Sequence, residues 1–462
     1  MLPKFAPSPT GAIPLHIVEK SALEAWSAGQ GDVTRRWITS MGFDASLGSM
    51  LSFPDLDGRI SAVLVGWGDE AARSRGHFHI AQIVPNLPGG TYRIASGLKK
   101  KERDEAALGW LLGQYHFDRY RKGKAPKARL TVPDGVDSDQ IEAIAAGEYF
   151  TRDLINTPAS DMGPEELEAA FRNLATRFDA GVEIIKGENL LLRKFPMIHA
   201  VGRAAEKPPR LMDLRWGPID GPKVTLVGKG VCFDTGGLDV KPASSMGLMK
   251  KDMGGAATVM GLAQMIMELR LPIRLRVLVP CVENAIAGNA FRPQDILISR
   301  KGLTVEINNT DAEGRLILAD ALAYADEEKP ELLFCLATLT GAARTALGAD
   351  LPAMFSDDVG LATAVSDAGN QVGDPVWRMP FWNGYESLIE PGIADLDNAP
   401  SGGMAGAITA ALFLRRFVTN PMGFAHFDIY GWTPSAKPAR PKGGVGQAAR
   451  ALLQVLIQRF GR

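Results

Sequence analysis

Cysteine and histidine, the residues that most often hold zinc or form disulfides, are scarce in this sequence. The 462 residues include three cysteines, each in an apolar stretch, at positions 232, 281 and 335. This pattern favours small buried side chains in a reducing compartment over disulfides. Among six histidines, only His77 and His79 lie close together, and alternation along a strand face explains their spacing. The sequence therefore offers no evident cysteine or histidine cluster for a metal.

An excess of charge of one sign is also missing, with 51 Lys and Arg residues against 52 Asp and Glu residues. This balance gives no electrostatic reason to expect nucleic acid or an acidic membrane as the main partner. No 18 apolar residues follow one another, and the first 20 residues contain no apolar run of signal-peptide length. We therefore expect a cytoplasmic protein, not bound to a membrane, that acts on a small ligand.

The first part of the chain has the pattern of a small α/β domain. Strand-like segments at residues 60–65 and 91–94 are followed by a helical pattern at residues 104–120. Residues 119–129 are basic and interrupted by glycine and proline, which is typical of an exposed connection. We predict an N-terminal domain over residues 1–135, a linking helix over residues 136–160 and a larger C-terminal domain over residues 161–462.

The larger domain alternates strands with helices. Short apolar runs predict strands at residues 182–185, 211–216, 224–233, 275–282, 303–307 and 332–337. Helical patterns occur at residues 164–178, 255–269 and 314–326. This order predicts an α/β fold with a mixed central sheet flanked by helices. In such folds the ligand site gathers at the carboxyl ends of the strands.

Four acidic residues lie where predicted strands or turns end: Asp234, Asp252, Asp311 and Glu313. Because converging carboxylates repel one another, one or more would stay protonated unless cations compensate them. An oxygen-rich cluster suits Mg, Mn or Zn, and two ions about 3.5 to 4 Å apart are the common hydrolytic arrangement. The sequence therefore predicts a divalent metal site in the larger domain.

Each of these residues also has an interpretation without chemistry. Asp252 could be an ordinary helix cap, and residues 311–313 could form a solvated turn. Lys229 stands between two glycines, which suggests a phosphate loop, but the required earlier glycine and following hydroxyl residue are missing. Arg315 could pair with a neighbouring acid, and Lys241 could be a surface charge.

Taken together, these segments resemble the leucyl (cytosol) aminopeptidase family, motif after motif in the same order. Residues 309–316 are similar to the family's signature octapeptide without departure. Further similar segments are residues 152–158, 228–234, 241–242, 252–256, 283–284, 338–342 and 406–411. The resemblance covers about residues 145–450 and implies a metal-dependent exopeptidase that releases the amino-terminal residue of peptides.

The resemblance also implies the metal ligands, residue by residue. One ion would be held by Asp234, Asp311 and Glu313, and a second by Lys229, Asp234, Asp252 and Glu313. The ions would be Zn or Mn, with Mg or Co as alternatives. Lysine is acceptable as a ligand because an adjacent dication disfavours its ammonium form.

Around the metals, the resemblance implies two catalytic residues. Lys241 would stabilise the oxyanion, and Arg315 would hold a bicarbonate ion that acts as general base. The backbone around this anion would come from Ala312, Gly314, Arg315 and Leu316, which agrees with anion binding at the start of a helix. A hydroxide that bridges the metals would attack the scissile carbonyl, while the free α-amine of the peptide binds one metal.

The resemblance implies substrate contacts for Met249, Thr338 and Asn309, in an apolar pocket that favours an amino-terminal Leu or a similar residue. One departure affects the shape of this pocket. After the segment 426–428 the family usually continues with small residues, whereas residues 429–432 are Ile, Tyr, Gly and Trp.

The resemblance implies little about the first domain except a role in assembly for residues 1–135. The protein would be a homo-oligomer, a hexamer of two trimers, that binds peptides with a free amino terminus. An additional DNA-binding role is one alternative, through Lys99–Lys101 and residues 119–129, although acidic residues interleave with both segments. Another metal-dependent hydrolase, such as a phosphoesterase, is the other alternative.

Overall fold

The computed structural model describes residues 3–461 and divides into two compact units. The first unit reaches Tyr149 and also includes Ser435–Lys442, while the second comprises Phe150–Pro434 and the chain from Gly443 onward. The division lies inside the helix α5 (Ser138–Asn156), in the region where the sequence predicts a linking helix. None of the described helices combines the length and the apolar character needed to cross a membrane.

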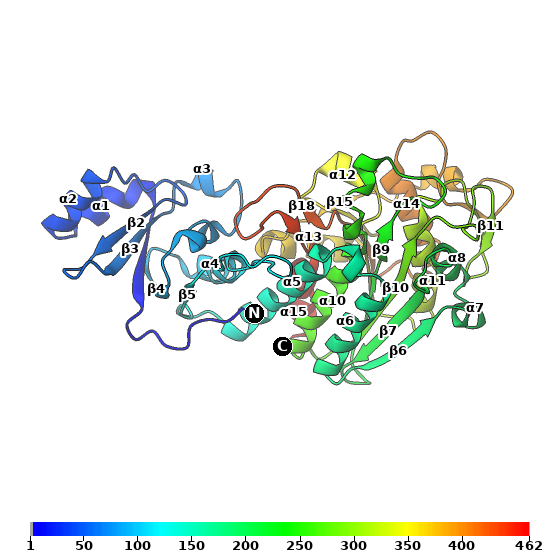
Figure 1. Cartoon of the computed structure of the whole chain (residues 1–462), viewed down its shortest axis with the longest axis horizontal. Coiled ribbons are helices and arrows are strands. Elements are labelled where there is room, and N and C mark those ends of the chain that lie inside the picture. The colour runs from blue at the N-terminus through cyan, green and yellow to red at the C-terminus, as the bar shows by residue number, and fades with distance from the viewer. Residues whose placement is uncertain (1–2, 462) are drawn as a thin grey trace. The chain divides into compact units, whose positions relative to one another are not determined.

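The first unit is built on a five-stranded sheet with the order β2-β3-β1-β4-β5 (Figure 1). Its strands are β1 (Ile13–Val18), β2 (Met50–Pro54), β3 (Ile60–Gly66), β4 (Gly90–Ser96) and β5 (Ala128–Leu130). Its helices before α5 are η1 (Lys20–Ala22), α1 (Leu23–Ala28), α2 (Asp32–Ser40), α3 (Glu70–Arg73), η2 (His79–Gln82), η3 (Val84–Asn86) and α4 (Lys100–Gly113). β2 is antiparallel to β3, and the other neighbours are parallel.

Apolar side chains of these helices pack on the sheet. Ile38 of α2 joins Val18 and Leu64 of the sheet in one buried cluster. Trp110 of α4 is fully buried and its ring centroid lies 5.9 Å from that of Tyr92 on β4. The unit therefore has a core of its own, as expected of an independent domain.

Two details of the first unit differ from the sequence prediction. The helix expected at residues 104–120 is α4, which begins at Lys100, because Glu102 accepts a hydrogen bond from the backbone amide of Lys99, and ends at Gly113. His79 begins a three-ten helix and does not lie on a strand. Its Nε2 lies 3.0 Å from the carbonyl oxygen of Arg73, so the strand-face explanation of the histidine pair was wrong.

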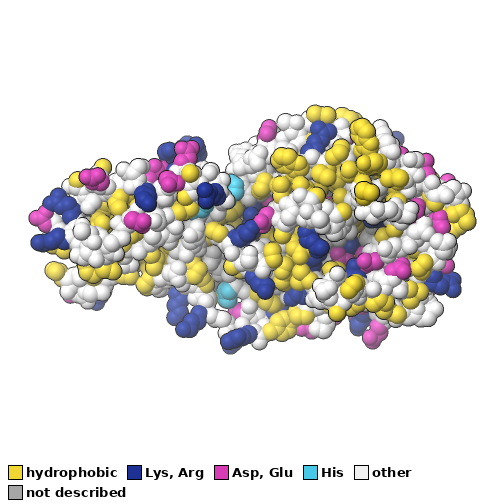
Figure 2. Space-filling view, turned by 90° about the horizontal axis from the view of Figure 1, so that it is seen from above, with side chains coloured by type: hydrophobic (Ala, Val, Ile, Leu, Met, Phe, Trp, Pro, Cys, Tyr) yellow, Lys and Arg dark blue, Asp and Glu magenta, His cyan; other side chains and the backbone are white. Residues whose placement is uncertain are grey.

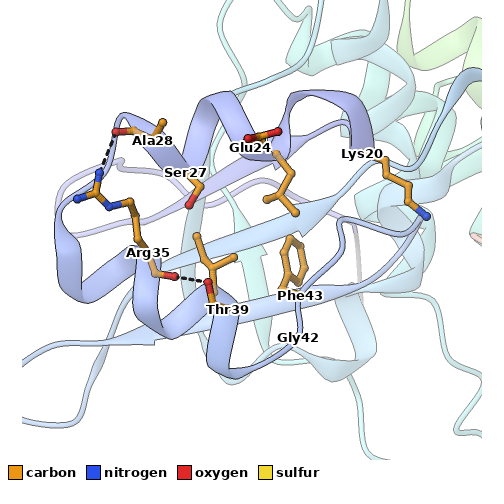
Figure 3. A pocket seen from close by; sticks show the side chains of 10 residues that line it. Lys20, Glu24, Ser27, Ala28, Arg35, Thr39, Gly42 and Phe43 are labelled. Carbon is orange, nitrogen blue, oxygen red and sulfur yellow. Dashed lines mark hydrogen bonds between the residues drawn. The ribbon is translucent and has the colours of Figure 1, made fainter.

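A surface cavity of about 680 Å³ lies beside α1 and α2 (Figure 3). Its lining mixes apolar and oppositely charged side chains, including Lys20, Glu24 and Phe43. Arg35 points along the rim and donates a hydrogen bond to the carbonyl oxygen of Ala28. These side chains show no clustering of metal ligands or nucleophiles, so the cavity carries no evident chemistry.

The second unit contains a nine-stranded mixed sheet. Along the sheet the order is β15-β14-β17-β13-β8-β10-β7-β6, and β9 also pairs with β10. The strands are β6 (Gly181–Lys186), β7 (Arg210–Trp216), β8 (Lys223–Gly228), β9 (Gly230–Asp234), β10 (Arg274–Asn284), β13 (Leu332–Ala337), β14 (Ala353–Phe355), β15 (Trp377–Met379) and β17 (Phe424–Asp428). β8, β10, β13 and β17 are parallel, whereas β6, β7 and β14 pair antiparallel with neighbours.

Helices cover both faces of this sheet (Figure 1). After α5, the helices of this unit are η4 (Ala159–Asp161), α6 (Pro164–Arg177), α7 (Asn189–Leu192), α8 (Pro196–Gly202), α9 (Ala243–Met246), η5 (Met249–Met253), α10 (Gly254–Glu268), α11 (Glu313–Asp326), α12 (Gly341–Leu347), α13 (Val359–Gln371), η6 (Asn383–Ile389), α14 (Gly406–Arg415) and α15 (Ala449–Phe460). α6 and α10 pack on one face, and α8 and α11 on the other, where they share a core with Val227, Leu278 and Cys335. The predicted α/β class with a mixed, helix-flanked sheet is confirmed.

One predicted strand is divided in the structure. The run at residues 224–233 forms β8 and β9 on either side of Lys229. The amide of Lys229 donates to Leu336 on β13, but its carbonyl accepts from Ala256 at the start of α10. As a result β8 pairs with both β10 and β13, whereas β9 pairs with β10 alone.

A second predicted strand lies outside the main sheet. Residues 303–307 form β12 (Thr304–Glu306), which pairs with β11 (Ile296–Ile298) and with β16 (Leu396–Asp397) in a separate three-stranded sheet. A short hairpin of β18 (Trp432–Thr433) and β19 (Gly443–Gly444) completes the strands. Over the face that Figure 2 shows, acidic and basic side chains are interspersed among apolar ones.

Candidate metal centre

Polar side chains gather at the carboxyl ends of the parallel strands, the edge at which the sequence predicts the ligand site. Lys229 follows β8, Asp234 ends β9, Thr338 follows β13 and Asp428 ends β17. All four residues are buried. Because their strands are neighbours, residues far apart in the sequence reach one region.

Lys229 lies at the centre of this region and is only 3% exposed. Its Nζ is 2.8 Å from Oδ2 of Asp252 and 2.9 Å from Oε1 of Glu313, and it donates to the carbonyl oxygen of Thr338 at 3.0 Å. Burial lowers the pKa of Lys229, but the carboxylates, Asp252 most strongly, raise it above its ordinary value. With carboxylates as its charged neighbours, the amine is therefore protonated.

Two glycines allow helices to begin against Lys229. A Cβ atom at Gly314, in the first turn of α11, would lie 2.6 Å from Cε of Lys229. At Gly255, in the first turn of α10, a Cβ atom would lie 2.2 Å from the carbonyl oxygen of Leu336. Any larger residue would have to move backbone or the lysine, so glycine is required here for close approach.

Three carboxylates surround the lysine. Asp234, Asp252 and Glu313 each offer an oxygen atom, and these atoms lie within 4.8 Å of one another. Burial, reinforced by Asp234, raises the pKa of Glu313 to about 8. Burial also raises the pKa of Asp252, against the opposite effect of Lys229. Without further positive charge, this cluster would have to retain a proton.

Asp311 lies beside Asp234 and pairs with the second lysine. Nζ of Lys241 lies 2.8 Å from Oδ2 of Asp234 and also pairs with Oδ1 of Asp311. Burial and Asp234 raise the pKa of Asp311 to about 6. Burial lowers the pKa of Lys241, but Asp234 and Asp311 raise it above its ordinary value, so this lysine is charged.

The carboxylate oxygens of the cluster fit a cation site. Among residues 3–461, Oδ2 of Asp252, Oε1 of Glu313 and Oδ1 of Asp311 each have a lysine ammonium as partner, whereas Oε2 of Glu313 is buried without any hydrogen-bond donor. Leaving such atoms unpaired is costly, and oxygen ligands of this type suit divalent cations. The donor set is therefore chemically suited to divalent metal ions.

Arg315 lies in the first turn of α11 and is buried. Its Nε has no hydrogen-bond acceptor within the described chain. Burial lowers the pKa of Arg315 to about 10, although Glu313 and Asp428 act in the opposite direction. A buried guanidinium with an unused donor, at the amino-terminal end of a helix beside Ala312, Gly314 and Leu316, is suited to a small anion.

The three residues predicted to contact substrate lie on different segments. Met249 begins η5 and is partly exposed, while the hydroxyl of Thr338 donates to Oδ1 of Asp252 at 2.8 Å. Asn309 has a different local function, because its Oδ1 accepts a hydrogen bond from the backbone amide of Asp311 at 2.7 Å. The side chain of Asn309 thus shapes the loop that carries this acid.

Several residues that support the site have no role in the sequence prediction. Nδ2 of Asn284 donates to Asp234 at 2.9 Å, and Nδ2 of Asn398 donates to the carbonyl oxygen of Asn309 at 2.7 Å. Asp428 accepts hydrogen bonds from the loop after β13, and burial raises its pKa to about 6. The position of Asn284 and Asp428 at strand ends, together with the segments 283–284 and 426–428 noted in the sequence, is the signal that could have identified them.

Comparisons with known proteins agree with the geometry. Residues 13–133 match the M17 aminopeptidase, N-terminal domain, and residues 149–453 match the cytosol aminopeptidase family, catalytic domain. A probable cytosol aminopeptidase of Roseiflexus castenholzii is 41% identical over 366 residues, which cover 75% of each chain.

Solved structures are similar over nearly the whole chain. A cytosol aminopeptidase from Coxiella burnetii has a TM-score of 0.93 and 44% identity, covering 97% of both chains. The bottromycin maturation enzyme BotP in complex with Mn has a TM-score of 0.85 and 33% identity, covering 96% of this chain and 98% of that chain. The chain therefore belongs to the cytosol aminopeptidase family, and it is an aminopeptidase, a hydrolase of peptides.

Proposed function

We propose that this enzyme is a metal-dependent aminopeptidase that releases Leu or another apolar residue from peptides with a free amino terminus. The observation that carries this proposal is the buried cluster of Asp234, Asp252 and Glu313, whose oxygens lie within 4.8 Å of one another. Among the described residues, Oε2 of Glu313 is buried without a hydrogen-bond donor, as expected of a metal ligand. The Mn complex of the related BotP supports a divalent ion.

Two ions would share these ligands. Asp234, Asp311 and Glu313 would hold one, and Lys229, Asp234, Asp252 and Glu313 the other, with Zn or Mn as the metals and Mg or Co as alternatives. When bound, the ions would polarise the scissile carbonyl and supply a bridging hydroxide as nucleophile. Lys229 must lose its proton to act as a ligand, which a neighbouring dication favours.

The remaining residues would position the substrate and move protons. Lys241 stays charged and would stabilise the oxyanion that forms on the scissile carbonyl. Arg315 would hold a bicarbonate ion as general base, through the donor that the described chain leaves unused. Met249 and Thr338 would line the pocket for the first side chain, with Asn309 holding the adjacent loop.

We further propose that the enzyme is a cytoplasmic homo-oligomer, a hexamer of two trimers, in which residues 1–135 serve assembly. Residues 136–160 would link this part to a catalytic domain over residues 161–462. The names of the related cytosol aminopeptidases support the cytoplasmic location.

An assay of the purified protein with metal analysis tests the proposed function. We expect hydrolysis of a leucine anilide, complete loss of hydrolysis with a chelator, and recovery when Zn or Mn is added. A phosphate ester should not be hydrolysed, because the proposed chemistry depends on a substrate amine. Activity that survives removal of all metal, or preferential cleavage of the ester, would contradict the proposal.

The two lysines should respond differently to substitution. Lys229→Ala should weaken binding of one ion, and excess metal should restore part of the activity because the other ligands of that ion remain. Lys241→Ala should retain both ions but lose about 10²- to 10³-fold in kcat, since it removes one preorganised oxyanion donor.

Metal content and kcat across a metal titration distinguish the two lysine variants. Added metal should rescue Lys229→Ala in part and Lys241→Ala not at all. If the Lys241→Ala protein were depleted of metal, or recovered activity with added metal, its role would be that of a ligand.

A further inference from the structure

Lys251 is a buried cation that the proposed metal site does not use. It lies on η5 between Met249 and Asp252 and is 5% exposed. Among the described residues, its ammonium has neither an ion pair nor a hydrogen-bond acceptor, and its contact is the ring of Tyr430, with Nζ 4.8 Å from the centroid. Because a buried charge is costly unless it is paired, this position favours an anion that the chain itself does not supply.

A second cation approaches the same ring. The guanidinium carbon of Arg344 lies 5.2 Å from the centroid of Tyr430. The neighbouring Lys250 differs, because its Nζ donates to the carbonyl oxygen of Asn156 at 2.6 Å while lying over the ring of Trp432. Lys250 thus has a partner in the chain, whereas Lys251 has an aromatic face.

The nearby acids are already engaged. Asp428 accepts hydrogen bonds from the amides of Leu339 and Thr340 and from the hydroxyl of Thr340. Oδ1 of Asp252 accepts from Thr338, and Oδ2 of Asp252 faces Lys229. Neither carboxylate lies within ion-pair distance of Lys251.

Lys251 and Arg344 contact Tyr430, which adjoins the residues proposed to receive the first side chain of the substrate. The amides of Tyr430 and Gly431 both donate to Oε1 of Gln447, at 2.8 and 3.0 Å, which fixes the backbone that carries the ring. Gly431 has a φ of 68°, and a Cβ atom there would lie 3.2 Å from Cγ2 of Thr338. Tyr430 and Arg344 also line a cavity of about 10 Å³, with room for about one water.

We propose that Lys251, assisted by Arg344, forms a subsite for a carboxylate of the peptide substrate, so that the enzyme accepts acidic as well as apolar amino-terminal residues. The inference rests on the proposed function, because it requires the first residue of the peptide to lie beside Met249 and Thr338. The carboxylate can come from the side chain of an amino-terminal Glu or Asp, or from the carboxyl terminus of a dipeptide. In either case it supplies the anion that a buried ammonium requires.

Matched substrates isolate the charge. We expect the wild-type enzyme to have a higher kcat/KM for a glutamate anilide than for the isosteric glutamine anilide. Lys251→Met should lower the Glu-to-Gln ratio on the order of 10- to 10²-fold, and Lys251→Arg should restore part of it. Lys250→Met is the matched control and should leave the ratio unchanged, because Lys250 already has an acceptor in the chain.

A second pair of substrates identifies the source of the carboxylate. If the ratio of Leu-Leu to Leu-Leu amide falls in Lys251→Met while the Glu-to-Gln ratio does not, the subsite binds the carboxyl terminus. If neither ratio changes, or if the wild type prefers the neutral member of both pairs, the inference is wrong.

Two measurements keep this test independent of other failures. If Lys251→Met does not fold, two other measurements test the inference. One is the Glu-to-Gln ratio of the wild type, and the other is the same ratio in the exposed Arg344→Met variant, where we expect a smaller loss. Cleavage of the leucine anilide by the wild type tests the proposed function separately, because it involves no substrate carboxylate.

Discussion

Replacing Glu313 by Ala should abolish peptide hydrolysis and reduce the metal content below two ions per chain. Glu313 is 1% exposed; its Oε1 lies 2.9 Å from the ammonium of Lys229, and its Oε2 has no hydrogen-bond donor among residues 3–461. As the proposed ligand to both ions it has no replacement, because alanine offers no oxygen atom to either ion. The expected result is activity at the background of the assay, measured together with metal content.

Two further variants define the reason for that loss. Glu313→Gln keeps the volume of the side chain but removes its charge, so it should lose metal as well. Glu327→Gln is the matched control, because Glu327 is an exposed acid just after the same helix and pairs with Arg300. A Glu313→Ala protein with two ions and normal turnover would show that the ligand assignment is wrong.

A peptide with an acetylated amino terminus should not be cleaved at a measurable rate, whereas the same peptide with a free terminus should be. The proposed role of the metal site includes binding the α-amine of the substrate, and acetylation converts this amine into an amide whose nitrogen no longer offers a lone pair. The measurement compares initial rates for free and acetylated Leu peptides at equal concentration.

A control separates this requirement from a general intolerance of blocked peptides. Amidation of the carboxyl terminus leaves the α-amine intact, so the amidated peptide should still be cleaved. Similar rates for the acetylated and the free peptide would contradict an exopeptidase mechanism.

The framework of the second unit could be predicted because its strands and helices have strong local patterns. β13 consists of six buried residues, as expected of a parallel strand covered on both faces. The acids at 234 and 311–313 follow apolar segments and Gly-rich turns, so the sequence could indicate that they reach one edge of the sheet.

What the sequence could not predict depends on pairing between distant segments. Residues 303–307 have a strand pattern, but β12 joins a separate sheet because its neighbour is the two-residue β16, which has no sequence signal of its own. The contact between Lys251 and Tyr430 likewise follows from tertiary packing alone. Periodicity describes one segment at a time, and it does not say which segments become neighbours.

The protonation of Lys229 shows a similar limit. The resemblance implies a neutral ligand, whereas the carboxylates around Lys229 hold its pKa above the ordinary value. The two statements concern different charge states of the site. A bound dication would place positive charge beside Lys229 and thereby favour its neutral amine. A sequence motif identifies the residue but not the charge state in which it is found.

The division between β8 and β9 has a mechanical consequence. β8 pairs with β13, but β9 does not. The hydrogen bonding between strands is therefore interrupted in the interior of the sheet and not at its edge. Residues that border this interruption are anchored to hydrogen-bonded strands on one side and to the starts of α10 and α11 on the other. Their positions are set when the chain folds, so little conformational entropy remains to be lost when a ligand binds. The rigidity that stabilises the sheet thereby also serves as preorganisation for catalysis.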